Sequence, residues 1–217
     1  GNSFIKNHLE AACDRSCVDI AAYLMQMGVR PGDRPDGSTL FHLVMPHAIR
    51  ENNNKAMIRL LLDKGVDPLA AARTKHGKID PITYAALYDD GEVVAWFLDA
   101  GGDPNLVNHY HMSNLETEHL SLAAIVVLRS APGQEQVLRT LAGYGANLDA
   151  RVDFNLNTLG LSAHMHGQDQ TYDSGERRMR NMSLLTLAAA IGQVDCTRFL
   201  LEHGLDPNDQ GARLTTP

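Results

Sequence analysis

The sequence predicts an all-α fold built from stacked helix-turn-helix units. Hydrophobic residues make up 44% of the 217 residues but aromatic residues only 6%, which favours thin helical layers over a bulky sandwich or barrel core. The apolar residues recur at helical spacing in short stretches. Similar stretches return along the whole chain, and such self-similarity is typical of a repeat architecture.

The clearest copy of the recurring stretch is SLLTLAAAIGQVDCTRFLLEHGLDPND, residues 183–209. It predicts two short helices that are separated at Gly192. Gly204 then stands where the second helix needs a left-handed residue to end it. Glycines close five such second helices, at Gly28, Gly65, Gly101, Gly145 and Gly204.

The first helix of each unit carries small residues that let neighbouring helices approach closely. These are the alanine pairs Ala11-Ala12, Ala85-Ala86, Ala123-Ala124 and Ala188-Ala189. We expect the side chains of Thr39, Asp80 and Ser183 to cap helix N-termini. The stretches Asp67-Pro68, Asp103-Pro104-Asn105 and Asp206-Pro207-Asn208 are typical of turns, because Asp and Asn side chains accept hydrogen bonds from the backbone that follows.

The upstream halves of the units read Thr39-Leu-Phe-His-Leu-Val44, Asp80-Pro-Ile-Thr-Tyr-Ala-Ala86, Glu118-His-Leu-Ser-Leu-Ala-Ala124 and Ser183-Leu-Leu-Thr-Leu-Ala-Ala189. Together with the closing glycines, these stretches resemble the ankyrin repeat, whose pattern includes Thr-Pro-Leu-His. The resemblance implies a single ankyrin-repeat domain over residues 1–217, a solenoid with finger loops. Its repeats are expected at about 1–33, 34–70, 71–107, 108–150 and 181–210. His42 matches the histidine of the motif, which implies that it orients the turn.

The closing glycines lie 37, 36, 44 and 59 residues apart, whereas an ankyrin unit has about 33 residues. The largest surplus is an insert at 151–180. Residues 151–156 are expected to form an extended finger strand, and Arg177, Arg178 and Arg180 place positive charge beside the next finger. Because long loops in compact proteins are often functional, we expect the insert to determine partner specificity.

The resemblance implies a scaffold for protein-protein interaction, with the partner on the concave side formed by the finger tips and the first helices. Position by position, it selects these partner-binding residues: Asp36, Ser38, His47, His76, Lys78, Tyr88, Ile125, Val126 and Ile191. We also expect Tyr110 of the preceding finger and Phe154, Arg177 and Arg178 of the insert to bind the partner. Four of them are expected to form an exposed hydrophobic strip: Tyr88, Ile125, Val126 and Ile191.

No catalytic constellation is apparent, so we expect a binding protein without a cofactor rather than an enzyme. One alternative is the substrate-targeting portion of a larger enzyme, such as the effectors that intracellular bacteria inject into host cells. The last repeat lacks a polar cap, from which we expect the natural chain to continue. Another alternative is a zinc site, because two histidine pairs on adjacent extended fingers would bring four imidazoles together. These are His109, His111, His164 and His166.

The three cysteines do not fit a disulfide framework or a zinc ribbon. Cys13 and Cys17 are spaced to share a helix face, and Cys196 stands at a core position. We expect free thiols and therefore a reducing compartment.

The formal net charge is −7, with 26 acidic and 19 basic residues. This balance argues against nucleic acid and anionic membranes as partners. We expect another protein as partner and a monomeric protein in the cytoplasm, or in the host cytoplasm for an effector.

Overall fold

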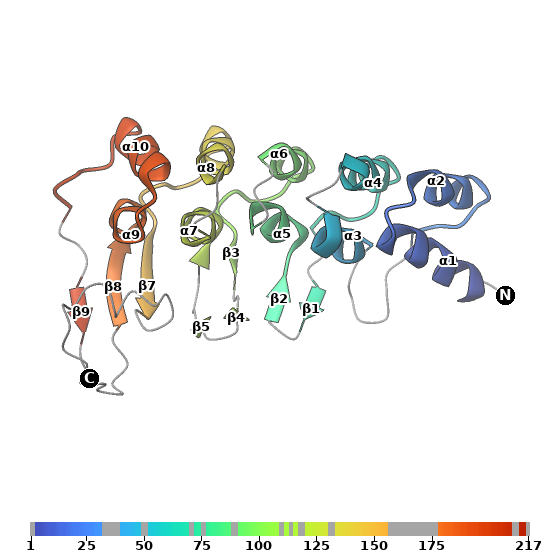
Figure 1. The fold of residues 1–217 in the computed structure, drawn as a ribbon, viewed down its shortest axis with the longest axis horizontal. Helices are drawn as coiled ribbons and strands as arrows, with labels where there is room; N and C mark the ends of the chain where they lie inside the picture. Colours follow the sequence, from blue (N-terminus) through green and yellow to red (C-terminus); the bar gives the residue numbers. More distant parts are fainter. Residues whose placement is uncertain are drawn as a thin grey trace. The chain divides into compact units, whose positions relative to one another are not determined.

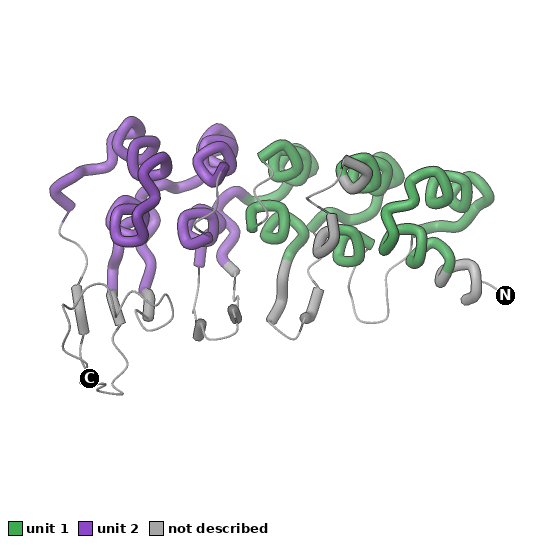
Figure 2. The backbone as a smooth tube through the Cα atoms, in the orientation of Figure 1, with its two compact units in different colours: residues 1–103 green, residues 104–217 purple. Residues whose placement is uncertain are grey.

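The fold is described from a computed structural model of residues 1–217. It describes residues 3–31, 40–48, 52–69, 72–74, 77–87, 91–108, 111–112, 115–116, 120–129, 133–155, 178–209 and 213–215. The described residues are mostly helical, as predicted, and they also form short antiparallel strands. The chain divides into two compact units, residues 1–103 and 104–217 (Figure 2).

Unit 1 contains three pairs of antiparallel helices (Figure 1). The pairs are α1 (Ser3–Asp14) with α2 (Val18–Gln26), α3 (Phe41–Ala48) with α4 (Asn52–Asp63), and α5 (Pro81–Leu87) with α6 (Gly91–Asp99). First helices contact one another, α1 with α3 and α3 with α5, and α2 contacts α4 in the same way. Each pair therefore buries its apolar face against the next pair.

The core of unit 1 lies between these helices. Phe41 of α3 packs edge-on against Phe97 of α6, with ring centres 5.3 Å apart. Met57, Ile58 and Leu61 of α4 are also fully buried. A hairpin of β1 (Ala72–Thr74) and β2 (Gly77–Ile79) precedes α5.

Unit 2 contains two helix pairs, α7 (Leu122–Leu128) with α8 (Gln134–Gly143) and α9 (Leu184–Ala190) with α10 (Val194–Glu202). Contacts of α7 with α9 and of α8 with α10 stack the two pairs.

Apart from its last strand, the strands of unit 2 precede its first helices. The two-stranded ladders are β3 (Val107–Asn108) with β6 (Leu120–Ser121) and β4 (His111–Met112) with β5 (Leu115–Glu116). A three-stranded sheet follows in the order β7 (Arg151–Asn155), β8 (Arg178–Ser183) and β9 (Arg213–Thr215). The predicted finger strand at 151–156 is thus confirmed over residues 151–155.

All five second helices end in the same way. The N–H of the closing glycine donates to the carbonyl three residues back, and the next N–H donates to the carbonyl five residues back. This pair of bonds is the Schellman motif, which requires a left-handed residue. The five glycines have φ between 72° and 98°, as predicted.

The predicted turns at Asp67 and Asp206 and the predicted cap at Ser183 are confirmed, whereas the side-chain cap at Asp80 stays a prediction. Side-chain oxygens of Asp67 and Asp206 accept bonds from backbone N–H groups two residues on, both at 2.8 Å. Ser183 caps α9 by accepting the N–H of Thr186 at 3.2 Å. Asp80 directly precedes α5, and its backbone carbonyl accepts the N–H of Thr83. Thr39 lies outside the described residues.

Candidate interaction surface

Two of the predicted partner-binding residues are not exposed. Ile125 and Val126 are buried, as are all residues of α7. They therefore cannot contribute to an exposed hydrophobic strip. Ile191 follows α9 and is half-buried.

The difference comes from where α7 begins. The repeat motif aligns Leu122-Ala123-Ala124 with Leu187-Ala188-Ala189, which places Ile125 near the end of its helix. In the structure Ser121 caps α7 by accepting the N–H of Ala124 at 3.3 Å, as Ser183 caps α9. Counted from these caps, Ile125 and Val126 correspond to Leu187 and Ala188, which are also buried. The helix starts one turn later than the motif suggests.

The other partner-binding positions fall in two groups. The first lies outside the described residues: Asp36, Ser38, His76, Tyr88, Tyr110 and Arg177. The second has its backbone placed in named elements: His47 in α3, Lys78 in β2, Phe154 in β7 and Arg178 in β8.

The two ends of the predicted insert lie in β7 and β8, which pair as antiparallel strands and form the base of the insert. In β7 and β8, Arg151 pairs with Ser183, Val152 with Met182, and Asn155 with Arg178. The register shifts at Asp153, whose carboxylate accepts the N–H of Asn181 at 2.9 Å. Asn181 has a φ of 59°, which Asn tolerates better than most residues. This β-bulge bends the hairpin at a defined position.

Arg151 joins this base to the turns around it. Its guanidinium forms ion pairs with Asp149, at 3.2 Å, and with Asp209. The same region encloses a hollow of about 430 Å³, lined by Leu148, Ser183, His203 and Asp206 among others. The base of the insert is thereby attached to the turns that follow both α8 and α10.

Sequence reasoning missed a contact between second helices. Arg59 of α4 lies over the ring of Trp96 in α6, 4.9 Å from its centre, and Arg139 of α8 lies 4.8 Å from the ring centre of Phe199 in α10. In both cases the arginine stands six residues before its closing glycine and the aromatic residue five before its own. Aligning the repeats on these glycines would have revealed the pattern.

The cysteines are all free. Burial raises the pKa of the Cys13 thiol from 9.0 to about 12, with a further contribution from Glu10. Burial likewise raises the pKa of Cys196 to about 11, helped by Glu135 and Asp195. Cys13 and Cys17 do not share a helix face, because α1 ends at Asp14 and Cys17 stands before α2.

Among the residues that the structure describes, no group of three or more His, Cys, Asp and Glu side chains is arranged to hold a metal ion. The predicted zinc ligands stay a prediction. His109, His164 and His166 lie outside the described residues, and His111 is placed only as backbone in β4. His42 packs edge-on against Tyr84 of α5, with ring centres 6.2 Å apart.

Antiparallel helix pairs that stack on equivalent faces and end in the same glycine turn are the class of structure that helical repeat proteins form. Residues 180–212 match the family model of the ankyrin repeat. The match covers the end of β8, α9, α10 and the turn that follows, and it supports an ankyrin-repeat protein. Ankyrin repeats are general modules of protein-protein interaction. In the described part of the chain, no helix is both long and apolar enough to cross a membrane.

Proposed function

We propose that this chain is a binding protein without catalytic activity of its own. Its five helix pairs act as five ankyrin repeats of one solenoid. The proposed surface comprises the finger tips, the accessible side of the first helices and the insert at 151–180. Eleven predicted residues remain part of it: Asp36, Ser38, His47, His76, Lys78, Tyr88, Tyr110, Phe154, Arg177, Arg178 and Ile191.

The observation that carries this proposal is the paired base of the insert. A loop that projects from two paired strands starts and ends at fixed positions, which lowers the entropy cost of presenting it to a partner. The base is held by the β7–β8 register, by the Asp153–Asn181 bond and by the ion pair of Arg151 with Asp209. Phe154 and Arg178 lie on these two strands, where an aromatic residue and an arginine are typical interface anchors.

The test is a pull-down from lysate with quantitative mass spectrometry. Because Asn155 and Arg178 are paired across the hairpin, residues 156–177 can be replaced by Asn-Gly, which closes two antiparallel strands in a tight turn. We expect this variant to keep its circular dichroism spectrum and to lose a partner that the intact chain recovers.

A second variant, Tyr88→Ala, tests the first-helix side of the surface. Its matched control is Tyr144→Ala, which removes an exposed tyrosine from the end of α8. We expect recovery of the partner to fall with Tyr88→Ala and to stay unchanged with Tyr144→Ala. Equal recovery by the intact chain, the Asn-Gly variant and Tyr88→Ala would exclude this surface.

A further inference from the structure

A hollow opens between the C-terminal halves of α4 and α6 in unit 1. Its volume is about 430 Å³, and it is lined by side chains of both helices and of the turn that follows α4. The apolar part of the lining includes Leu62, Val66, Pro68 and Trp96. Val66 is buried, whereas Trp96 is half-buried and leaves part of its ring accessible. The hollow is formed by second helices and is therefore distinct from the proposed surface of finger loops and first helices.

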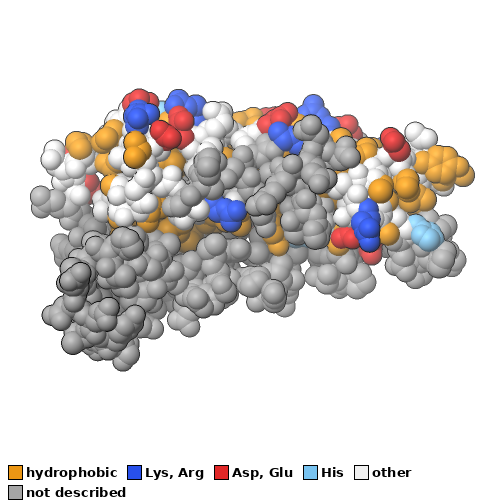
Figure 3. Space-filling model, viewed as in Figure 1, with side chains coloured by type: hydrophobic (Ala, Val, Ile, Leu, Met, Phe, Trp, Pro, Cys, Tyr) orange, Lys and Arg blue, Asp and Glu red, His pale blue; other side chains and the backbone are white. Residues whose placement is uncertain are grey.

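The polar part of the lining carries more negative than positive charge. Among the described residues that line the hollow, Asp63, Asp67 and Asp99 supply carboxylates and Arg59 supplies a guanidinium. Asp63 and Asp99 are the last residues of α4 and α6, so the negative ends of both helix dipoles lie here. Figure 3 shows acidic and basic side chains close together on the surface over these two helices. These surroundings favour a cation.

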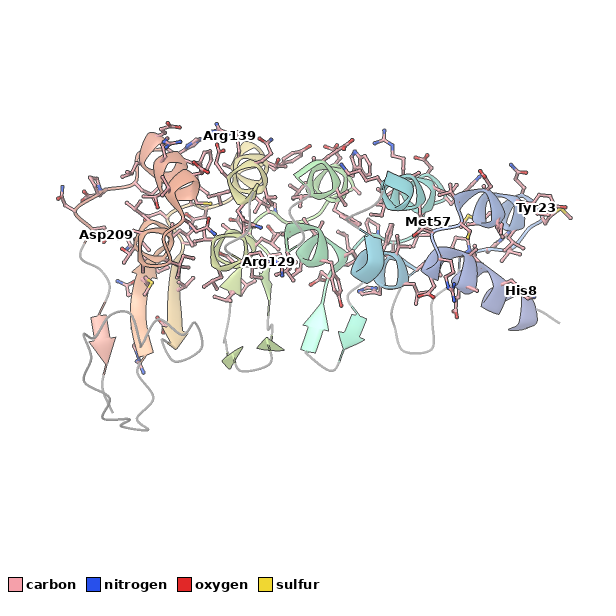
Figure 4. All side chains as sticks on the ribbon, in the orientation of Figure 1. His8, Tyr23, Met57, Arg129, Arg139 and Asp209 are labelled. Carbon is pink, nitrogen blue, oxygen red and sulfur yellow. The ribbon has the colours of Figure 1, made fainter. Side chains whose placement is uncertain are left out.

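The equivalent helix pair of unit 2 shows which groups an aromatic ring at this position accepts. Arg139 of α8 lies over Phe199 of α10, as Arg59 lies over Trp96 (Figure 4). A second planar group, the imidazole of His203, also packs on Phe199, with ring centres 3.9 Å apart and the rings tilted by 40°. The His203 ring is fixed by a 2.8 Å hydrogen bond between its Nδ1 and the carbonyl of Phe199.

In unit 1 the position that corresponds to His203 carries no ring. His203 follows Phe199 by four residues, and the residue four after Trp96 is Ala100, which lines the hollow. Because alanine has only a methyl group, it cannot stack on the indole. The hollow therefore includes the space beside the indole that an imidazole fills beside Phe199.

We propose that this hollow binds an arginine side chain of a partner protein. The guanidinium stacks on Trp96 in the place that His203 takes on Phe199, and its N–H groups donate to the carboxylates at the ends of α4 and α6. The methylene groups of the arginine lie on the apolar lining. The chain's net charge of −7 also favours a basic partner.

Arginine fits this combination better than lysine does. Its guanidinium is planar, so it can stack on an aromatic ring and donate several hydrogen bonds at once, whereas an ammonium group is a compact and strongly hydrated charge. The contact goes beyond the proposed finger surface. Its test does not depend on that surface, because it measures binding at Trp96 directly.

The direct test is a titration of the intact chain with the peptide acetyl-Gly-Arg-Gly-amide. Trp96 is the only tryptophan, so it gives one indole signal in a two-dimensional proton–nitrogen NMR spectrum. We expect the arginine peptide to shift this signal saturably and the corresponding lysine peptide to bind more weakly. The citrulline peptide keeps the shape of arginine without its charge and is expected to leave the signal in place.

Three results of this titration would contradict the proposal. An indole signal that does not move with the arginine peptide overturns the site, and so does one that moves equally with the citrulline peptide. Equal affinity for the lysine peptide overturns the choice of arginine.

Ala100→His tests the site from within the chain. The introduced imidazole is expected to stack on Trp96 as His203 stacks on Phe199, so that it fills the hollow and binding of the arginine peptide is lost. The matched control is Ala56→His, since Ala56 is an exposed alanine of α4 that does not line the hollow. Unchanged binding by an Ala100→His variant that keeps its circular dichroism spectrum overturns the proposal.

The carboxylates are tested by Asp63→Asn combined with Asp99→Asn. Because the charges are exposed, each change is expected to weaken binding of the arginine peptide by about 2- to 5-fold. Asp19→Asn combined with Glu202→Gln removes the same charge at exposed positions outside the hollow, and Glu202 is the residue equivalent to Asp99. This control is expected to keep the affinity. Equal weakening by both double variants would mean that only the overall charge attracts the peptide.

Discussion

At the scale of single residues, glycine sets the end of each second helix. Gly145 has a φ of 87°, and no heavy atom lies within 4 Å of where a Cβ would be placed. Its identity is therefore required by backbone conformation and not by lack of space. This requirement was visible in the sequence, because a glycine recurs at the same position after each predicted second helix.

Gly145→Ala is expected to destabilise the protein by about 1 kcal/mol, since alanine is strained at positive φ. Gly143→Ala is the matched control. Gly143 is the last residue of α8, lacks a positive φ and also has open space at its Cβ, so alanine there is expected to stabilise by roughly 0.5 kcal/mol. Urea denaturation measures the free energy of unfolding of both variants. Equal effects would mean that the left-handed conformation is not what selects Gly145.

Burial also decides the chemistry of the thiols. Cys13 is fully buried and Cys17 only partly so. We expect iodoacetamide at neutral pH to modify Cys17 first and to reach Cys13 and Cys196 only after denaturation. Peptide mass spectrometry of the labelled chain reads this order, and rapid labelling of Cys13 in the folded protein would contradict its burial.

The raised pKa of Cys13 has a consequence for stability in alkali. A thiol whose pKa is higher in the folded state favours folding as long as it is protonated. This contribution is complete below the unfolded value of 9.0 and is lost as the pH rises towards 12. Cys13→Ala is expected to reduce the loss of stability over that range, as measured by denaturation at several pH values.

At the scale of elements, the helices were predictable, but the starting point of α7 was not. Helical spacing and closing glycines identified the two helices of each unit. The start of α7 depends on which polar side chain caps it, and the motif alignment places Glu118 at the position of Ser183. The structure uses Ser121, and that choice moves Ile125 from the end of the helix to its middle.

Ile125→Asp is expected to destabilise unit 2 by about 3 kcal/mol or more, because it places a charge at a buried site. Ala190→Asp is the control, since Ala190 is the residue that motif alignment equates with Ile125 and it is exposed at the end of α9. Its effect is expected to stay below about 1 kcal/mol. Thermal melts followed by circular dichroism compare the stability of the two variants. Similar losses of stability would favour the alignment on the repeat motif over the alignment on the capping serines.

At the scale of the whole molecule, stacked repeats contact mainly their neighbours. A destabilising substitution is therefore expected to loosen mainly the repeat that contains it. The sequence predicted the helix pairs and the strand that begins the insert. It did not predict that Ile20 of α2 is exposed, because Ile20 resembles the buried Met57 and Val93 in chemistry.

Leu200→Ala and Leu61→Ala form a matched pair, because both leucines are fully buried four residues before a closing glycine. Each is expected to cost about 2–5 kcal/mol. Hydrogen exchange should show lost protection around α9 and α10 for Leu200→Ala, and around α3 and α4 for Leu61→Ala. Uniform loss over both units with either variant would show that the chain unfolds as one cooperative body.

The stacking of Arg59 on Trp96 has a practical consequence for such experiments. Trp96 is the only tryptophan of the chain, and it belongs to unit 1. Its intrinsic fluorescence therefore reports on the packing of α4 against α6, while circular dichroism records the helix content of both units. Comparing the two signals during denaturation separates the melting of unit 1 from that of unit 2 without attaching a dye.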